Sequence, residues 1–354
     1  MNFKIQILFG GGNVFLPDNN STYFSFYAKL FNPDLITRLL ISLCFIYFLP
    51  GVQAQDTTRI TLDSSKPATL PPSTTYLSPE STRQPNKSRI WWVSVAHVAL
   101  YGGSLLILNE TWYKNYPKQG FTSFDDSKEW LQMDKIGHAW SAYTLSLVST
   151  NTWKWAGLSD KKSAIIGSAS GFAFLTVIEL LDAHSSGWGW SWSDVAANSL
   201  GTGLFLSQEL LWKEQRIQFK FSFHRKNYVD ETLNMRSDEL FGSTTRERML
   251  KDYNGQTYWL SIDMDKFIRF PKWLNFAVGY GAEGMVYARD EQNIEAGYPP
   301  AYRQYYLSID FDLRAIKSRS KVVNTLIFFA SMIKIPAPTI EFSPKGTKVY
   351  AFYF

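Results

Sequence analysis

Cysteine is almost absent from this chain of 354 residues, because Cys44 is the only one. A single thiol excludes disulfides within the chain and any zinc site built from cysteines. The sequence also lacks a run of lysine and arginine that would follow a nucleic-acid backbone, and its net charge of +5 is mild. We therefore expect neither a disulfide-stapled fold nor a nucleic-acid partner.

Motifs that specify a reaction are missing as well. The chain has no nucleophile elbow, phosphate-binding loop or HExxH sequence, and no cofactor motif is evident. Aromatic residues, in contrast, are abundant, at 16% of the chain with 13 Trp and 19 Tyr. Tyr and Trp gather where one end of the ring is apolar and the other is wet, as at a membrane surface. The composition thus favours membrane contact and leaves enzymatic activity undecided.

Residues 1–54 have the features of a leader with a secretory signal peptide. A basic residue precedes an apolar core over residues 39–48, and small residues follow, which predicts cleavage and a mature start near Gln55. The core is too short to cross a bilayer. Leu43 stands before Cys44 where a lipidation signal has a small residue, so we expect no lipid anchor there. The leader predicts an exported protein of the cell envelope.

Two regions of different character follow the leader. Residues 55–89 are rich in Ser, Thr and Pro and carry little apolar surface, which predicts a disordered linker. Residues 90–214 are predicted to form a domain of about four apolar helices. The stretches that have helical length and period are residues 90–108, 130–155, 164–181 and 195–212. The first has the length to cross a bilayer or to form a buried core helix.

Polar residues stand out on these apolar helices. Asp134 and His138 are four residues apart and share a helix face, as do Asp194 and Asn198. Charged groups among apolar helices are costly unless they pair. We therefore expect one polar cluster, made of Asp134, Lys135, His138, Glu179, Asp182, Asp194 and Asn198.

Three interpretations of this cluster compete. It is a structural network of salt bridges and hydrogen bonds that fixes helix register. It is a divalent metal site, for which His138, Asp182 and Asp194 are the candidate ligands. Or it is an acid/base centre, with His138 and Glu179 as the candidate catalytic residues, because crowded carboxylates raise the pKa of one of them.

An aromatic segment lies between the third and fourth predicted helices. Trp188, Trp190 and Trp192 alternate there with small residues. They form either an aromatic lip that faces a sugar or a lipid above the cluster, or an interfacial belt or packed loop, which we favour.

Three motifs in this half resemble the YfiM-like family of uncharacterised predicted periplasmic and outer-membrane proteins. They are Asp134-Lys135-Ile136-Gly137-His138, Glu179-Leu180-Leu181-Asp182, and Trp190-Ser191-Trp192-Ser193-Asp194 followed by Asn198 and Gly201. Elements of the first and third motifs are also similar to the VanZ-like membrane family, more distantly. The resemblance covers roughly residues 130–211. It implies an envelope location and a helical domain, and it implies no catalytic role.

Past Gln215 the hydrophobic period changes from helical to alternating, which predicts a β-rich region over residues 215–354. The fold class expected is therefore α+β, with the helical domain followed by antiparallel strands. Candidate strands lie at residues 217–223, 258–265, 274–280, 305–313 and 348–354, and candidate helices at residues 243–253 and 323–333. We leave open whether the strands close into a barrel, for which eight is the usual minimum.

Two of the strands place paired aspartates on one face, Asp263 with Asp265 and Asp310 with Asp312. We interpret them as the wet face of a sheet or a barrel lumen in preference to a calcium site. The terminal strand ends in Phe354, like the insertion signal of outer-membrane β-proteins, which favours the outer over the inner membrane.

The sequence as a whole predicts an exported, membrane-associated envelope protein whose polar cluster is structural or binds a ligand. The alternative is a membrane-embedded enzyme, dependent on a metal or on acid/base chemistry, that acts on an envelope lipid or glycan.

Overall fold

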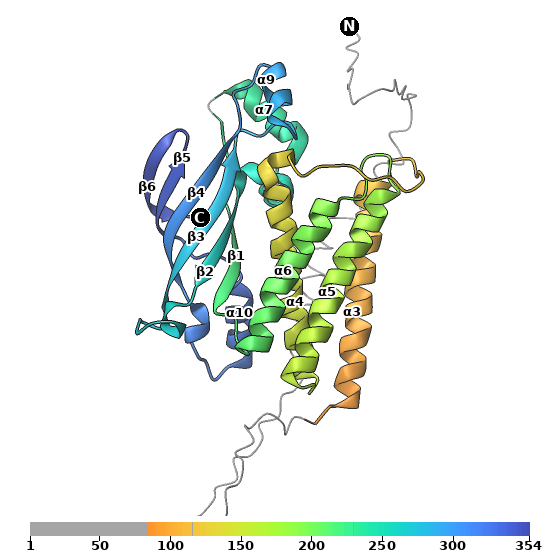
Figure 1. Ribbon diagram of the computed structural model, residues 1–354, viewed down its shortest axis with the longest axis vertical. Coiled ribbons are helices and arrows are strands. Elements are labelled where there is room, and N and C mark those ends of the chain that lie inside the picture. The colour runs from red at the N-terminus through yellow and green to blue at the C-terminus, as the bar shows by residue number, and fades with distance from the viewer. Residues whose placement is uncertain (1–83, 115, 229) are drawn as a thin grey trace, which may run out of the picture. The chain divides into compact units, whose positions relative to one another are not determined.

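The computed structural model describes residues 84–114, 116–228 and 230–354 (Figure 1). The predicted leader and most of the predicted linker lie outside these residues. Among the described residues, the first helix begins at Lys87, a few residues before the start expected from the sequence, because the Asn86 side chain accepts a hydrogen bond from the backbone N–H of Arg89 and caps it.

In the described part of the chain four long helices come first, and short helical turns lie in the connection between the first two. They are α3 (Lys87–Leu108), α4 (Met133–Trp155), α5 (Asp160–Ala183) and α6 (Trp192–Leu211), with η1 (Asn109–Tyr113) after α3 and η2 (Glu129–Gln132) before α4. Helices α3 and α5 are long and apolar enough to cross a membrane, judged by length and composition. The side chains of Ser159 and Ser191 cap α5 and α6.

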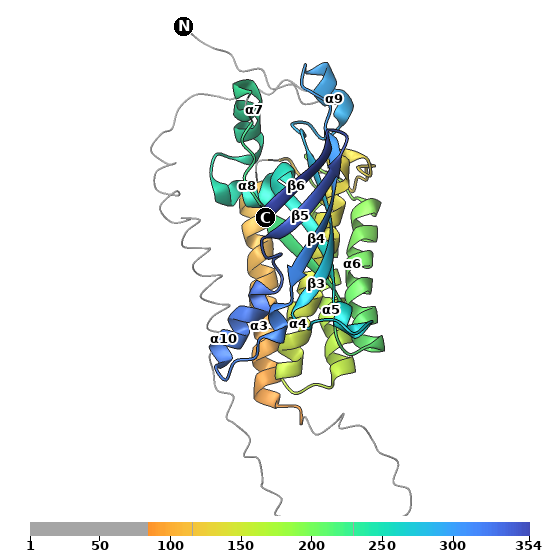
Figure 2. The same cartoon turned by 90° about the vertical axis from the view of Figure 1, so that its left-hand side faces the viewer.

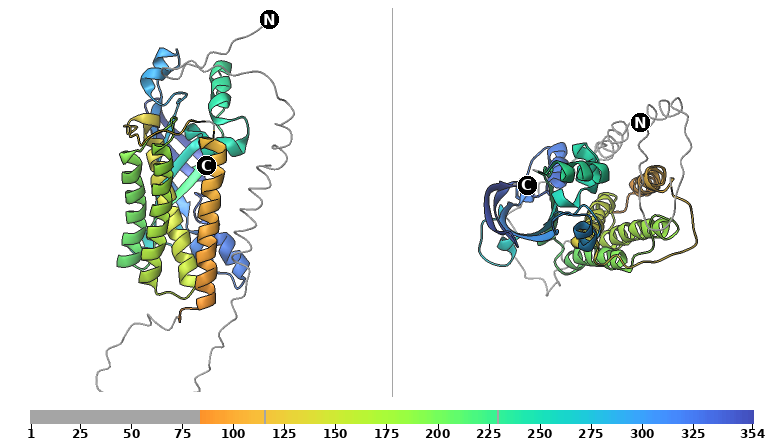
Figure 3. Two further views of the ribbon diagram at one scale, coloured as in Figure 1. Left: turned by 90° about the vertical axis from the view of Figure 1, so that its right-hand side faces the viewer. Right: turned by 90° about the horizontal axis from the view of Figure 1, so that it is seen from above.

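Six antiparallel strands follow and pair in chain order, which confirms the predicted α+β class. They are β1 (Ile217–Phe223), β2 (Gln256–Ile262), β3 (Leu274–Glu283), β4 (Tyr302–Phe311), β5 (Ala337–Ser343) and β6 (Gly346–Tyr353). The connections hold α7 (Glu231–Phe241), α8 (Thr245–Lys251), α9 (Asp290–Glu295), α10 (Lys321–Ala330) and the short turns η3 (Tyr253–Gly255), η4 (Met264–Lys266) and η5 (Leu313–Ala315). Seen from above, the sheet curls strongly (Figure 3).

The curl brings the two ends of the sheet together. Tyr353 of β6 reaches back to β2, where its hydroxyl lies 3.1 Å from Oγ1 of Thr257. On the far edge of β1, Phe221 exchanges backbone hydrogen bonds with Met332 and Lys334, which lie just before β5. The two edge strands of the sheet, β1 and β6, therefore both make contacts beyond their one neighbouring strand.

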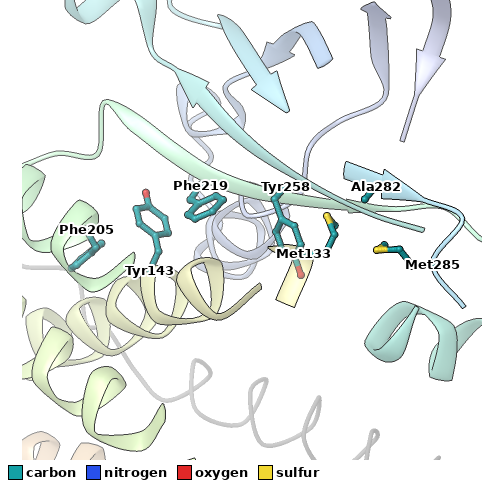
Figure 4. Packing of buried hydrophobic residues seen from close by; sticks show 7 residues of the cluster. All are labelled: Met133, Tyr143, Phe205, Phe219, Tyr258, Ala282 and Met285. Atoms are coloured by element: carbon teal, nitrogen blue, oxygen red, sulfur yellow. The ribbon is translucent and has the colours of Figure 1, made fainter. Parts of the chain in front are cut away.

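The main hydrophobic core joins α4 to the outer face of β1 and β2. Tyr143 of α4 packs against Phe219 of β1 and Phe205 of α6, and Met133 and Tyr258 extend the same cluster (Figure 4). Buried aromatic pairs of this kind stabilise beyond the area they bury. This core fixes the start of α4, where the polar cluster lies, against the sheet.

Three of the four paired aspartates lie in ionic contacts on the inner side of the sheet or at its end, whereas Asp265 lies in η4, because β2 ends at Ile262. Asp310 pairs with Lys220 at 2.6 Å, and neither side chain is exposed. Arg314 lies 2.8 Å from Asp263 and 2.9 Å from Asp312. Lys334 lies 4.0 Å from Asp310, and burial lowers the pKa of its ammonium group while Asp310 opposes that shift. Asp263, Asp310 and Asp312 are thus held by basic side chains.

Candidate functional site

The candidate site lies where the first turns of α4 and α6 meet the end of α5. Its centre is Lys135, whose ammonium group contacts Asp126, lies 2.9 Å from Asp134 and lies 2.7 Å from Asp194. One cation therefore bridges three carboxylates that come from a loop, from α4 and from α6.

Asp126 is a member that the sequence did not indicate. Its second oxygen accepts hydrogen bonds from the hydroxyls of Ser191 at 2.7 Å and Ser193 at 2.6 Å. Burial alone raises the pKa of the Asp126 carboxyl, but the hydrogen bonds from Lys135 and the two serines outweigh it and hold the pKa below its usual value. Asp126 is therefore a firmly ionised anchor that ties the loop to the start of α6.

His138 lies between two sets of acceptors. On one side its Nδ1 is 3.3 Å from Oδ1 of Asn198, and because that oxygen can only accept, Nδ1 carries the proton. On the other side Nε2 is 3.9 Å from Asp134 Oδ1 and 3.8 Å from Asp194 Oδ1. The Nε2 of His138 and one oxygen of each of these two carboxylates thus face one small space, within 4.8 Å of one another.

Glu179 is the most deeply buried carboxyl of the cluster, with a side chain only 1% exposed. Its Oε1 lies 3.7 Å from Nδ1 of His138 and, among the described residues, accepts no hydrogen bond. The Nδ2 of Asn198 likewise lacks a hydrogen-bond partner there. Buried polar atoms are almost always satisfied in folded proteins. The cluster is therefore not a closed network of its own side chains.

Two tyrosine hydroxyls complete the site from outside the predicted set. Tyr253 donates to Oδ1 of Asp134 at 2.7 Å, and Tyr113 donates to Oδ1 of Asp182 at 2.6 Å. Burial, together with the neighbouring carboxylates, raises the pKa of both phenols, so each stays protonated and donates. Asp182 is oriented toward Tyr113 and is not a member of the group of three, in which Asp134 stands instead.

The entry to α4 has an unusual backbone. Trp130, Leu131 and Gln132 have positive φ values of 50°, 48° and 64°. A left-handed conformation costs an L-residue about 1–2 kcal/mol, so the turn depends on the sheet for support. Tyr280 of β3 donates to the Leu131 carbonyl at 2.5 Å, and Arg303 of β4 donates to Gln132 at 2.5 Å. The sheet thereby fixes the position of the start of α4, and with it the positions of Asp134 and His138.

The three tryptophans lie beside this site as an aromatic layer. Trp188 packs edge-on against Tyr113 and Tyr116, while Trp190 contacts Phe121 and Trp192. Trp192 is 70% exposed, so part of the layer faces outward. Trp192 opens α6 two residues before Asp194, which places the aromatic layer directly at the cluster.

An α+β protein whose helical half holds a buried ionic cluster is the class that this fold and site define. Residues 120–208 match a family model described as predicted periplasmic lipoprotein (DUF2279). The matched segment includes the polar cluster and the aromatic layer and ends before β1. The match supports an exported protein of the cell envelope. No curated protein and no solved structure matches the chain.

Proposed function

We propose that this chain is an exported, membrane-associated envelope protein whose polar cluster binds a divalent cation. The observation that carries the proposal is the convergence of His138 Nε2, Asp134 Oδ1 and Asp194 Oδ1 within 4.8 Å. The Nδ1–H of His138 is engaged by Asn198, which is the outer contact that orients a metal-binding imidazole. We include in this proposal the resemblance to the YfiM-like family, and more distantly to the VanZ-like family, which implies an envelope location.

The charge of the site supports a cation. Three carboxylates, those of Asp126, Asp134 and Asp194, surround a single ammonium group, that of Lys135, beside the imidazole of His138. Unbalanced buried charge is expensive, and a divalent ion would offset it. It would also attract Oε1 of Glu179, which accepts no hydrogen bond from the described residues.

The donor set indicates which ions fit. One imidazole and two carboxylates suit zinc or a first-row transition metal, whereas calcium and magnesium prefer oxygen ligands throughout. Lys135 lies 2.7 Å from Asp194 and so competes for one of the ligands. We therefore expect binding to weaken when protons occupy His138 at low pH.

Replacing His138 with glutamine should remove the cation. Purified mature protein is expected to carry about one divalent ion per chain by elemental analysis, since three ligands plus water complete such a site. The H138Q variant should lose at least about 90% of it, because the loss of one ligand lowers affinity by 10-fold or more.

His97 offers the matched control for this experiment. It is also a helix histidine, with Nδ1 2.8 Å from the Val93 carbonyl and Nε2 2.8 Å from the Ser149 hydroxyl, but it lies on α3 away from the cluster. The H97Q variant should keep its ion. Equal metal content in the two variants would contradict the cation proposal.

The alternative function is an enzyme that acts on an envelope lipid or glycan. It is favoured by the buried Oε1 of Glu179, which lies 3.7 Å from His138 without a hydrogen bond from the described residues. Such a pair exchanges protons with a substrate in many enzymes. Yet a substrate must reach the pair, and the side chain of His138 is only 21% exposed. Cation binding needs less room and is preferred.

We place the protein in the outer membrane in preference to the inner membrane. The support is the antiparallel sheet, whose strands β3 to β6 expose apolar side chains on the outside while Lys220 and Asp310 are buried on the inside. Separation of the two membranes followed by immunoblotting should recover the chain with the outer membrane. Recovery in the inner membrane alone would overturn this placement.

A further inference from the structure

The sheet carries apolar side chains on its outside. The outward positions of β3 to β6 are largely aliphatic or aromatic, and eight of them are strongly exposed: Phe276, Val278, Tyr305, Leu307, Ile340, Phe342, Val349 and Phe352. Strands β3 to β6, which carry these residues, face the viewer in Figure 2. A water-soluble protein rarely exposes a continuous apolar surface of this kind.

The inside of the same sheet combines a small aromatic cluster of Trp259, Tyr306 and Tyr353 with buried polar and charged side chains. Lys220, Ser261 and Asp310 are fully buried and joined to one another, with Ser261 donating to Asp310 at 2.7 Å. Gln304 donates to the buried Glu341 at 3.1 Å. Strands that alternate apolar outside and polar inside are the pattern of β-structures in membranes.

The helices repeat this reversed pattern. The outer faces of α5 and α6 expose Ile165, Val177, Leu200 and Leu210, and no ionisable residue lies between Lys162 and Glu179 on α5. Their inner faces bury Ser, Gln and Glu side chains instead. Only 11% and 33% of the residues in the apolar stretches of the candidate spans α3 and α5 are buried, so much of their apolar surface faces outward.

The dimensions fit one bilayer. Helices α3 and α5 contain 22 and 24 residues, which at 1.5 Å per residue gives roughly 33 and 36 Å. Strands β3 and β4 contain 10 residues each, and a membrane strand needs about 9–11. The hydrocarbon core is about 30 Å thick, so α3, α5, β3 and β4 have lengths that match it, whereas β5 and β6, with 7 and 8 residues, are shorter.

One end of the elements carries aromatic and basic residues together. Arg89, in the first turn of α3, lies 4.8 Å over the ring of Trp155 at the end of α4. Trp212, after α6, contacts Phe267 in the β2–β3 connection and lies under Arg216. Further basic residues border the same ends: Lys161, Lys162, Lys213, Arg269, Lys272, Lys317, Arg319 and Lys321.

The opposite end of the helices carries the aromatic layer around Trp188, Trp190 and Trp192. Aromatic residues at both ends of an apolar zone, with Lys and Arg beyond one of them, mark the two interfaces of a bilayer and attract anionic lipid head groups.

We propose that the outer faces of α3, α5 and α6 and of strands β3 to β6 form one lipid-facing surface, so that helices and sheet lie in the same bilayer. This goes beyond membrane association, because it assigns the surface, its two limits and its basic end. The polar cluster then lies at the interface opposite the basic end, beside the aromatic layer.

Cysteine accessibility tests the proposal. In a full-length Cys44→Ser background, single variants Val278→Cys, Leu200→Cys and Val349→Cys replace residues that are 43%, 72% and 76% exposed. Lys251→Cys on α8 and Glu295→Cys on α9 are exposed controls. Membranes of expressing cells are treated with a water-soluble maleimide. The three outward positions should react at least about tenfold more slowly than the controls, since hydrocarbon excludes the reagent.

A second measurement distinguishes lipid from a protein cover. A fluorophore attached at Val278→Cys or Leu200→Cys should be quenched by lipids with brominated acyl chains. Labelling as fast as the controls overturns the proposal, and so does protection without quenching, which would mean that another protein or a second copy covers the surface. None of these positions belongs to the polar cluster, so a failed cation proposal shows in metal content and not in this experiment.

Discussion

Gly201→Ala is expected to destabilise the protein by about 2–4 kcal/mol, although alanine is the better helix former. A Cβ atom at Gly201 would lie 1.9 Å from the carbonyl oxygen of Ala139 and 2.7 Å from its carbonyl carbon. Both atoms belong to the backbone of α4, which no side-chain rotation can clear. The two helices must therefore separate.

Gly203 on the same helix is the matched control, because a Cβ atom there meets nothing within 4 Å. Gly203→Ala should stabilise the helix by about 0.5–1 kcal/mol. Thermal and urea unfolding of the purified proteins would measure both changes. If the two alanine variants shift stability in the same direction, the close approach of α6 to α4 is wrong.

Gly201→Ala should also change the geometry of the polar cluster. Ala139 follows His138, and Gly201 lies one turn after Asn198. Separating the two helices therefore breaks the 3.3 Å contact between His138 and Asn198. Gly201→Ala should therefore also weaken cation binding, while Gly203→Ala should leave it unchanged. This links the small-residue packing of the helices to the geometry of the cluster.

Much of the fold follows from periodicity in the sequence. The helical period predicts α4, α5 and α6 closely, and the alternating period predicts five of the strands. Strand β5 was missed, because Pro338 interrupts its pattern and proline removes a backbone donor. The structure accommodates it with an irregular register between Ala337 and Thr339. Helix α7 was also missed, because only Leu233, Ser237 and Phe241 of its residues are buried.

The candidate site likewise has some residues that the sequence predicts and others that it does not. Spacing on single helices predicts which polar residues share a face, and the structure brings Asp134, His138 and Asp194 together. Asp126 and Tyr253 could not be predicted as members of the site. Asp126 comes from a loop and Tyr253 from η3, and the two are more than 100 residues apart along the chain. Nothing in a local pattern specifies such contacts. The serines of the Ser191-Trp192-Ser193 segment were the available signal, since they bind Asp126 as well as starting α6.

Lys135→Met is expected to destabilise the metal-free protein by about 3–5 kcal/mol, the cost of leaving a buried ion pair without one partner. Lys135 contacts Asp126, Asp134 and Asp194, and its side chain is only 10% exposed. Methionine keeps the volume and removes the charge, so three carboxylates are left close together. Lys161→Met, at an exposed position near the start of α5, should change stability by less than about 0.5 kcal/mol.

The response of Lys135→Met to metal separates the two main interpretations of the cluster. If the cluster binds a divalent ion, zinc or manganese should restore much of the lost stability, because the ion replaces the missing positive charge and no longer competes with Lys135. Melting temperatures with and without the ion, in Lys135→Met and in the double variant with His138→Gln, measure this rescue. Rescue that persists without His138 would exclude the proposed ligand set, and a large loss without any rescue would leave a network that is structural alone.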